Sequence, residues 1–226
     1  MRRPVVVAAL AMVAATACGK HYLNQYDFSD KTLALVFIEP PAPQLLHGWS
    51  HLRSGDNALQ AVVRAGAGVA KEVEARRASD RLDSAALSVD VEALVAQRTL
   101  ERASRYLGTR AVSTVNGADY VLEINMRSFG IDARSNNATY LFTRAEAVLL
   151  DRRTGREIWN DDVRGSNRLP PYAVGTRNIP SAIISAGTLH TVTIADFQEA
   201  LEQLTTFTSD LIVGELREKL RDVRDQ

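Results

Sequence analysis

Cysteine is nearly absent from this sequence, and one Cys among 226 residues excludes any disulfide within the chain. Net charge is absent as well, because 27 Lys and Arg balance 27 Asp and Glu. A nucleic-acid-binding protein needs a concentrated basic surface to meet phosphates, so this balance argues against that class. No uncharged apolar run reaches about 18 residues, which excludes a membrane-spanning helix. What is present, 46% hydrophobic and 24% charged residues, is the composition of a globular protein.

The first residues have the pattern of an export signal. Residues 1–3, Met-Arg-Arg, form a short basic start, and residues 5–17 are apolar or small but too few to span a bilayer. The tripeptide Ala-Thr-Ala then stands directly before Cys18. This segment resembles the lipobox of bacterial lipoproteins, with Ala15 where Leu is usual. We therefore predict a lipoprotein signal peptide over residues 1–17 and lipidation of Cys18.

Two other interpretations of Cys18 stay open. In the first, the chain has a plain secretory signal that is cut after an Ala-x-Ala-like site, and Cys18 is incidental. In the second, Cys18 is a buried cysteine of a cytosolic protein, which leaves the basic start and the apolar run unexplained.

Acylation would decide where the protein resides. Acyl chains on Cys18, palmitate among them, would hold the protein on a membrane, since several chains anchor far more firmly than one. By resemblance to enteric sorting rules, Gly19 after the cysteine favours the outer membrane, with the protein facing the periplasm of the cell envelope. Loss of the signal leaves a mature charge of about −2, so the lipid and not electrostatic attraction must provide the anchor.

The mature chain divides into a short tether over residues 18–30 and a single periplasmic domain over residues 31–226. The apolar run 32–38 is typical of a buried strand that ends at prolines, and an irregular segment should follow to about Asn57. Helical periodicity then predicts a helix over residues 58–78. A second helix should begin at the N-cap Ser88 and stop at Gly108.

The periodicity changes to two residues after Gly117. It predicts strands over residues 120–128, 139–150 and 156–163, with a tight turn over 151–155. A capping box at Thr193 and Asp196 starts a long helix. The expected fold class is α+β, with an early strand, two helices, a three-stranded antiparallel meander and a long C-terminal helix packed on the sheet.

Signatures of catalysis are missing from the sequence. His47 and His51 have a spacing that could place both on one helix face, but Gly48 and the nearby prolines favour a surface pair in a loop. The sequence has neither a G-x-S-x-G nucleophile motif nor a phosphate-binding glycine pattern. Asp151 should cap its own turn, and Asp161 and Asp162 should point to opposite faces of a strand. We expect no enzyme activity, no metal and no cofactor.

The segment Gly117–Glu123, the turn Asp-Arg-Arg-Thr-Gly at 151–155 and the following Glu-Ile-Trp at 157–159 carry a resemblance. They are similar to the meander of the auxiliary lipoproteins of ABC-type lipid transport systems, including those that work with MCE proteins. They also resemble the curli-secretion and synthase-activator lipoproteins, whose domain is like the amino-terminal domain of the Tol propeller protein. Both resemblances imply a fold and no catalytic site.

The first resemblance implies a non-enzymatic accessory or docking component of an envelope lipid transport system. The alternatives are an activator or assembly lipoprotein of a cell-wall synthase or secretion machine, and a periplasmic lipid carrier with an apolar cavity. Partner binding would use exposed edges of the meander or the apolar segment of Ile179, Ile183 and Ile184. Trp159 is a further candidate for partner contact, although a packing role suits a strand tryptophan better.

Overall fold

The computed structural model describes residues 22–38, 40–47, 73–133, 140–168 and 191–224. Residues 73–86 are helical. The other elements, in chain order, are η1 (Leu23–Gln25), β1 (Thr32–Ile38), β2 (Gln44–His47), α2 (Val91–Leu107), β3 (Arg110–Ala111), β4 (Tyr120–Ala133), β5 (Tyr140–Asp151), β6 (Arg156–Arg168) and α3 (Ile194–Arg224).

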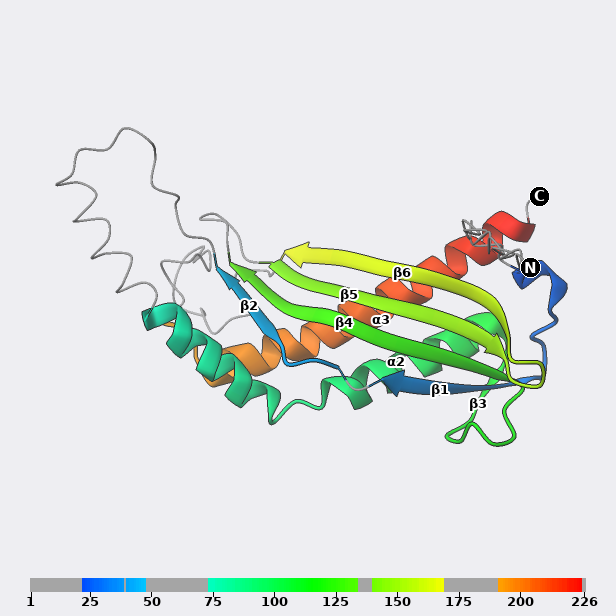
Figure 1. The fold of residues 1–226 in the computed structure, drawn as a ribbon, viewed down its shortest axis with the longest axis horizontal. Helices are drawn as coiled ribbons and strands as arrows, with labels where there is room; N and C mark the ends of the chain where they lie inside the picture. The colour runs from blue at the N-terminus through cyan, green and yellow to red at the C-terminus, as the bar shows by residue number, and fades with distance from the viewer. Residues whose placement is uncertain (1–21, 39, 48–72, 134–139, 169–190, 225–226) are drawn as a thin grey trace, which may run out of the picture.

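One mixed sheet organises the domain. Its strand order is β3-β1-β4-β5-β6, and β2 also pairs with β4. β4, β5 and β6 form an antiparallel meander, whereas β1 and β2 both run parallel to β4 along the same edge. The helices α2 and α3 lie together on one face of the sheet (Figure 1). The predicted α+β class, the meander and the long C-terminal helix packed on the sheet are confirmed.

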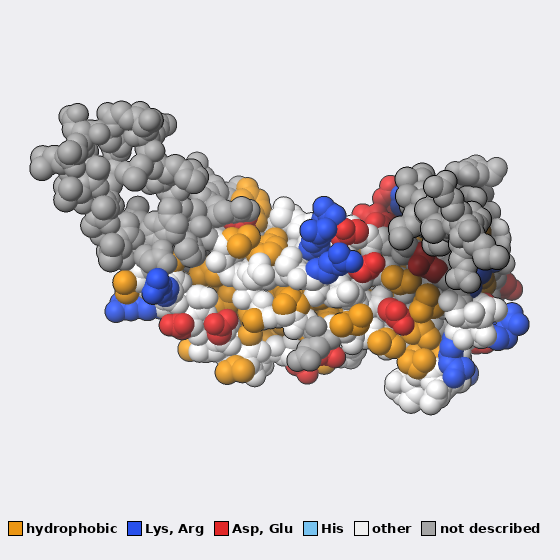
Figure 2. All heavy atoms as spheres, viewed as in Figure 1, with side chains coloured by type: hydrophobic (Ala, Val, Ile, Leu, Met, Phe, Trp, Pro, Cys, Tyr) orange, Lys and Arg blue, Asp and Glu red, His pale blue; other side chains and the backbone are white. Residues whose placement is uncertain are grey.

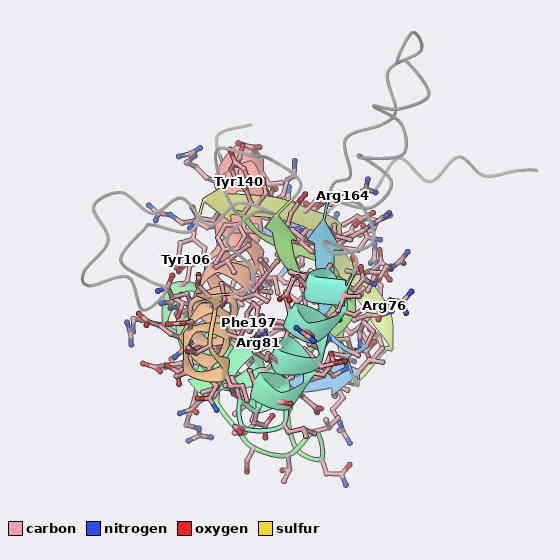
Figure 3. The ribbon with its side chains drawn as sticks, turned by 90° about the vertical axis from the view of Figure 1, so that its left-hand side faces the viewer. Arg76, Arg81, Tyr106, Tyr140, Arg164 and Phe197 are labelled. Carbon is pink, nitrogen blue, oxygen red and sulfur yellow. The ribbon has the colours of Figure 1, made fainter. Side chains whose placement is uncertain are left out.

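The hydrophobic core lies between the sheet and the helices. In β5 every second residue is buried, which is the period-two pattern of a strand with one face covered. Leu141, Ala145 and Leu149 point from β5 into this core, where Leu201 and Leu204 of α3 are fully buried. Figure 3 views the domain from the left-hand side of Figure 1 and places Tyr106 of α2 on the helical side, with Arg164 of β6 on the opposite side of the sheet.

The capping residues fix where the helices begin and end. Asp90, and not the predicted Ser88, is the N-cap of α2, and its Oδ1 accepts a hydrogen bond of 2.8 Å from the Ala93 N–H. The predicted stop at Gly108 is confirmed, with φ of 74°. The predicted capping box of α3 is also confirmed, because the Thr193 N–H donates to Asp196 Oδ2 and the Asp196 N–H donates to Thr193 Oγ1.

The first helix differs from its prediction. It continues to residue 86, beyond the predicted end at residue 78, and its buried residues recur at helical spacing. The buried positions are Ala75, Ala78, Leu82 and Ala85. Most of the glycine-containing stripe predicted over residues 58–78 lies outside the described residues.

The segment after β1 was predicted to be irregular as far as about Asn57, and this is wrong for Gln44–His47. These residues form β2, which pairs with Gly130–Ala133 of β4. Pro40, Pro41 and Pro43 lack the N–H that a sheet needs, so they interrupt the edge between β1 and β2 without ending it. The backbone of Gln44 lies so close to Gly130 that only glycine fits there. His47 is the last residue of β2, and His51 lies outside the described residues.

Residues 22–30 belong to the folded domain, and the predicted tether is wrong for them. Leu23 of η1 is 1% exposed, and Phe28 is also buried in the core. The Tyr22 N–H donates to the Ile158 carbonyl at 2.9 Å, which fixes the start of this segment to β6. Polar, aromatic and apolar residues are mixed in this segment without a regular period, so nothing in the sequence indicated that Leu23 and Phe28 are buried.

Candidate functional site

A cavity of about 560 Å³ lies where the β5–β6 hairpin meets the start of β1 and β4. Three segments that are distant in the sequence form its wall. The lining residues are Gln25, Tyr26, Asp27, Lys31, Gly117, Ala118, Asp119, Tyr120, Asp151, Arg152 and Arg153. We call this the hairpin-end cavity. Its lining is mixed, with three carboxylates, three basic side chains and two tyrosine rings.

The hairpin turn positions two of the basic side chains. Asp151 Oδ1 accepts from the Thr154 N–H at 3.1 Å, and the Gly155 N–H donates to the Asp151 carbonyl at 2.8 Å. Gly155 has φ of 68°, the left-handed geometry that lets the chain return into β6. The predicted turn and the predicted capping role of Asp151 are confirmed. The turn leaves Arg152 and Arg153 exposed at its tip.

Asp119, which lines the cavity, is held in place by hydrogen bonds with Thr32. The Thr32 N–H and hydroxyl both donate to Asp119 Oδ2 at 2.8 Å, and the Asp119 N–H donates to Thr32 Oγ1 at 2.9 Å. The hydrogen bond from the Thr32 backbone, followed by that from its hydroxyl, lowers the pKa of Asp119. Asp27 has a lowered pKa for a similar reason, chiefly the hydrogen bond from the Ser29 N–H. Both carboxylates are therefore ionised at neutral pH.

We expect Asp119 to contribute to the acid sensitivity of the fold. A carboxyl whose pKa is lowered by folding stabilises the folded state above its ordinary pKa, and this contribution is lost as the pH falls through the lowered value. Asp119→Asn should cost about 1 kcal/mol at pH 7, because a charge-assisted hydrogen bond is weakened. The variant should also lose less stability than the wild type below about pH 4.

Urea unfolding at a series of pH values measures both effects. Asp83→Asn is the matched control, because Asp83 lies exposed on the first helix. Parallel pH profiles for Asp119→Asn and the wild type would contradict the role assigned to this carboxylate.

Aromatic rings close the inner side of the cavity. The ring of Tyr120 packs edge-on against Tyr26 at 6.2 Å between centroids and lies 4.8 Å from Phe28. The Tyr120 hydroxyl donates to the Asp27 carbonyl at 3.1 Å. Burial, followed by the charge of Asp151, raises the pKa of Tyr120, so its phenol stays neutral and serves as a hydrogen-bond donor.

The acidic and basic side chains around the cavity differ in their hydrogen bonding. Asp27, Asp119 and Asp151 accept hydrogen bonds from backbone N–H groups, which fixes their positions. Arg152 donates to the Asn116 side chain at 3.3 Å, while Arg153 has no hydrogen bond or ion pair within the described part of the chain. Such a lining can recognise a polar group that carries both signs of charge.

The face of the sheet opposite the helices is a second candidate surface. Arg127 pairs with Glu146 at 2.6 Å, and Asp162 pairs with both Arg144 and Arg164. Hydrogen bonds from Arg164 and then Arg144 hold the pKa of Asp162 well below its usual range. Figure 2 shows basic and acidic side chains gathered over the middle of this face with hydrophobic side chains beside them. We call it the open sheet face.

The structure tests only one of the predicted partner-binding residues. Trp159 is 1% exposed and lies in the core, so its packing role is confirmed and its side chain offers no surface to a partner. Its burial follows from a register shift in the β5–β6 pairing, which lets Ile158 and Trp159 both be buried. Cys18, Ile179, Ile183 and Ile184 lie outside the described residues.

Two other kinds of site are not found among the described residues. No helix there combines the length and the hydropathy that a bilayer-spanning segment needs. Across residues 22–38, 40–47, 73–133, 140–168 and 191–224, no three His, Cys, Asp or Glu side chains are grouped as a metal site requires.

The hairpin-end cavity is a site that the sequence did not predict. Gly117–Glu123 was predicted to lead into a strand and residues 151–155 to form a turn, and each prediction is correct for its own segment. A signal was present in the two adjacent arginines at the tip of a tight turn. Nothing in the sequence placed them beside Tyr26 and Lys31.

Comparison with known proteins gives similarity of structure only. No protein-family profile matches the chain, and no curated protein matches it. A Xanthomonas campestris protein of the DUF330 family is 18% identical over 57% of this chain and 65% of its own, with a TM-score of 0.32. This chain therefore spans less than two thirds of that protein.

Two further structures are similar at a comparable level. A proposed lipoprotein from Caulobacter crescentus CB15 is 18% identical over 57% of this chain and 84% of its own, with a TM-score of 0.34. The dodecamer of a PelC point variant from Paraburkholderia phytofirmans is 8% identical over 76% of this chain and 89% of its own, with a TM-score of 0.32. At these identities and TM-scores the matches assign neither a family nor a function to this chain.

Proposed function

We propose that the protein is a lipid-anchored lipoprotein of the bacterial envelope that acts, without catalysis, as a docking component of an ABC- or MCE-type lipid transport system. Acyl chains on Cys18 would restrict the domain to the membrane surface and raise its concentration near membrane-bound partners. The signal pattern before Cys18 supports the anchor. The resemblance of the segments 117–123 and 151–159 to the auxiliary lipoproteins supports the choice of system.

The open sheet face is the observation that carries the docking role. Both α2 and α3 pack on the other face, and within the described residues no helix covers this one. Ile38, at the end of β1, is 48% exposed and pairs with Asn125 of β4, two residues before Arg127. An exposed apolar side chain with charged side chains around it is compatible with a protein–protein interface that has a polar rim.

Site-specific cross-linking in intact cells tests this function. A photoreactive amino acid at position 38, on the tagged full-length protein, should capture a permease, an ATPase or an MCE component, which mass spectrometry identifies. The matched control is the same amino acid at position 87, where Leu87 is 92% exposed beyond the end of the first helix. Position 87 should capture none of these proteins.

Capture of other proteins in the same experiment would contradict the proposal. Capture of a cell-wall synthase or a secretion channel at position 38 would favour the activator or assembly role. Equal capture of abundant envelope proteins at both positions would contradict docking through the open sheet face.

A further inference from the structure

The first described residues, from Tyr22 onward, are held at the hairpin end of the sheet. The Tyr22 N–H donates to the Ile158 carbonyl at 2.9 Å, and the Arg156 guanidinium lies 3.9 Å from the centroid of the Tyr22 ring. Leu23 follows in the core with 1% exposure. The backbone at Tyr22 therefore cannot move away from the β5–β6 hairpin without breaking these contacts.

Chain length then limits the distance between the hairpin and the lipid anchor. Tyr22 is four residues after Cys18, and four residues span at most about 14 Å when fully extended. Gln25 and Tyr26 line the hairpin-end cavity, so the cavity lies directly beside Tyr22. If Cys18 is acylated, as the proposed function requires, this end of the domain must lie at the lipid head groups.

The opposite end of the domain is held far from the anchor. β5 has 12 residues, so the sheet extends about 40 Å from the hairpin end. Residues 44–47, which form β2, lie at that far end (Figure 1). The anchor therefore selects one end of the domain for contact with the membrane.

The charges of the cavity fit a head group that is itself both positive and negative. Lys31, Arg152 and Arg153 are donors suited to a phosphate. Asp27 and Asp119 are carboxylates suited to an ammonium group, and Tyr26 also lines the cavity. A head group with phosphate alone would leave the carboxylates facing an anion, which is unfavourable.

We propose that the hairpin-end cavity binds the head group of a zwitterionic phospholipid, such as phosphatidylethanolamine, in the membrane that holds Cys18. The cavity supplies basic side chains for the phosphate and carboxylates for the ammonium group. Its polar lining suits a head group and not acyl chains, so the role differs from that of a carrier that encloses whole lipids. This inference rests on the lipid anchor of the proposed function.

Binding of soluble head groups tests the chemistry of the cavity. The full-length protein in a non-ionic detergent is titrated by calorimetry with glycerophosphoethanolamine, with glycerol phosphate and with ethanolamine. Glycerophosphoethanolamine should bind at least about tenfold more tightly than either compound that carries charge of only one sign. Arg153→Ser should weaken its binding about tenfold. Arg77→Ser is the matched control, because Arg77 is exposed and pairs with Glu74 on the first helix, and it should leave binding unchanged.

Fluorescence quenching tests the orientation. Acylated Thr154→Cys and Leu87→Cys proteins carry a fluorophore on the new thiol and are placed in phosphatidylethanolamine–phosphatidylcholine vesicles with nitroxide-labelled head groups. Thr154 is at the hairpin tip, and quenching there should exceed quenching at position 87. Equal quenching at the two positions would overturn the orientation.

The outcomes separate this inference from the proposed function. Mass measurement that finds Cys18 without acyl chains would overturn the anchor and the membrane placement, while the titrations would still decide the chemistry of the cavity. Glycerol phosphate that binds as tightly as glycerophosphoethanolamine would show a simple anion site and overturn the zwitterion proposal. Absence of binding by all three compounds would overturn it as well.

Discussion

Trp159→Ala should lower the free energy of unfolding by about 3–5 kcal/mol, the range expected when a fully buried aromatic side chain is removed from a core. Trp159 is among the largest fully buried side chains of the described domain, at 1% exposure. Within the described residues its Nε1 has no hydrogen-bond partner, so the loss is one of packing and not of polar contacts. Surrounding side chains relax only partly around a cavity of this kind, which is why the cost is large.

Urea unfolding monitored by circular dichroism measures this loss. Leu87→Ala is the control and should stay within about 0.5 kcal/mol of the wild type, because Leu87 is 92% exposed. A Trp159→Ala protein with wild-type stability and impaired partner capture would return Trp159 to the partner-binding residues. That result would also mean that the β5–β6 register differs from the one described.

Gly130→Ala should release β2 from the sheet and destabilise the domain by about 2 kcal/mol or more. Gly130 has φ of 149°, a conformation that residues with a side chain rarely adopt. An added Cβ would overlap with the backbone carbonyl oxygen of Gln44, which is the partner of Gly130 in the β2–β4 pairing. Backbone atoms cannot rotate away as a flexible side chain can, so the strand itself must move.

Two measurements on the same variant separate these effects. Urea unfolding gives the overall loss, and amide hydrogen exchange should show reduced protection at Leu45 and Leu46 of β2. Gly214→Ala is the control, since, apart from the backbone of α3 itself, no atom of the described residues lies within 4 Å of the position of its Cβ, and alanine favours a helix by up to about 1 kcal/mol. Unchanged exchange at β2 in Gly130→Ala would contradict the close approach of β2 to Gly130.

The hairpin-end cavity and the open sheet face are proposed to bind different partners. The hairpin-end cavity lies beside the start of the domain and, with an acylated Cys18, faces the lipid. The open sheet face extends away from that end. No described helix covers it, so a protein partner can reach it. A domain anchored at one end can therefore bind the membrane and a partner at the same time, because the two surfaces do not overlap.

Local interactions explain which elements the sequence predicted. The capping box at Thr193, the stop at Gly108 and the turn closed by Gly155 each depend on contacts within about five residues. Alternation in β5 and the periodicity of α3 depend on one buried face, which the order of apolar residues records directly. The same local signals predicted the α+β class and the order of its elements.

Contacts between segments that are distant in the sequence were determined only by the tertiary structure. Thr32 holds Asp119 in the lining of the cavity although the two are 87 residues apart, and Tyr22 bonds to Ile158 although they are distant in the sequence. β2 is a strand because β4 offers it hydrogen-bond partners beside Gly130, although its own four residues have no distinctive pattern. A short segment takes its conformation from the groups that it meets, and a single sequence does not record which distant groups those will be.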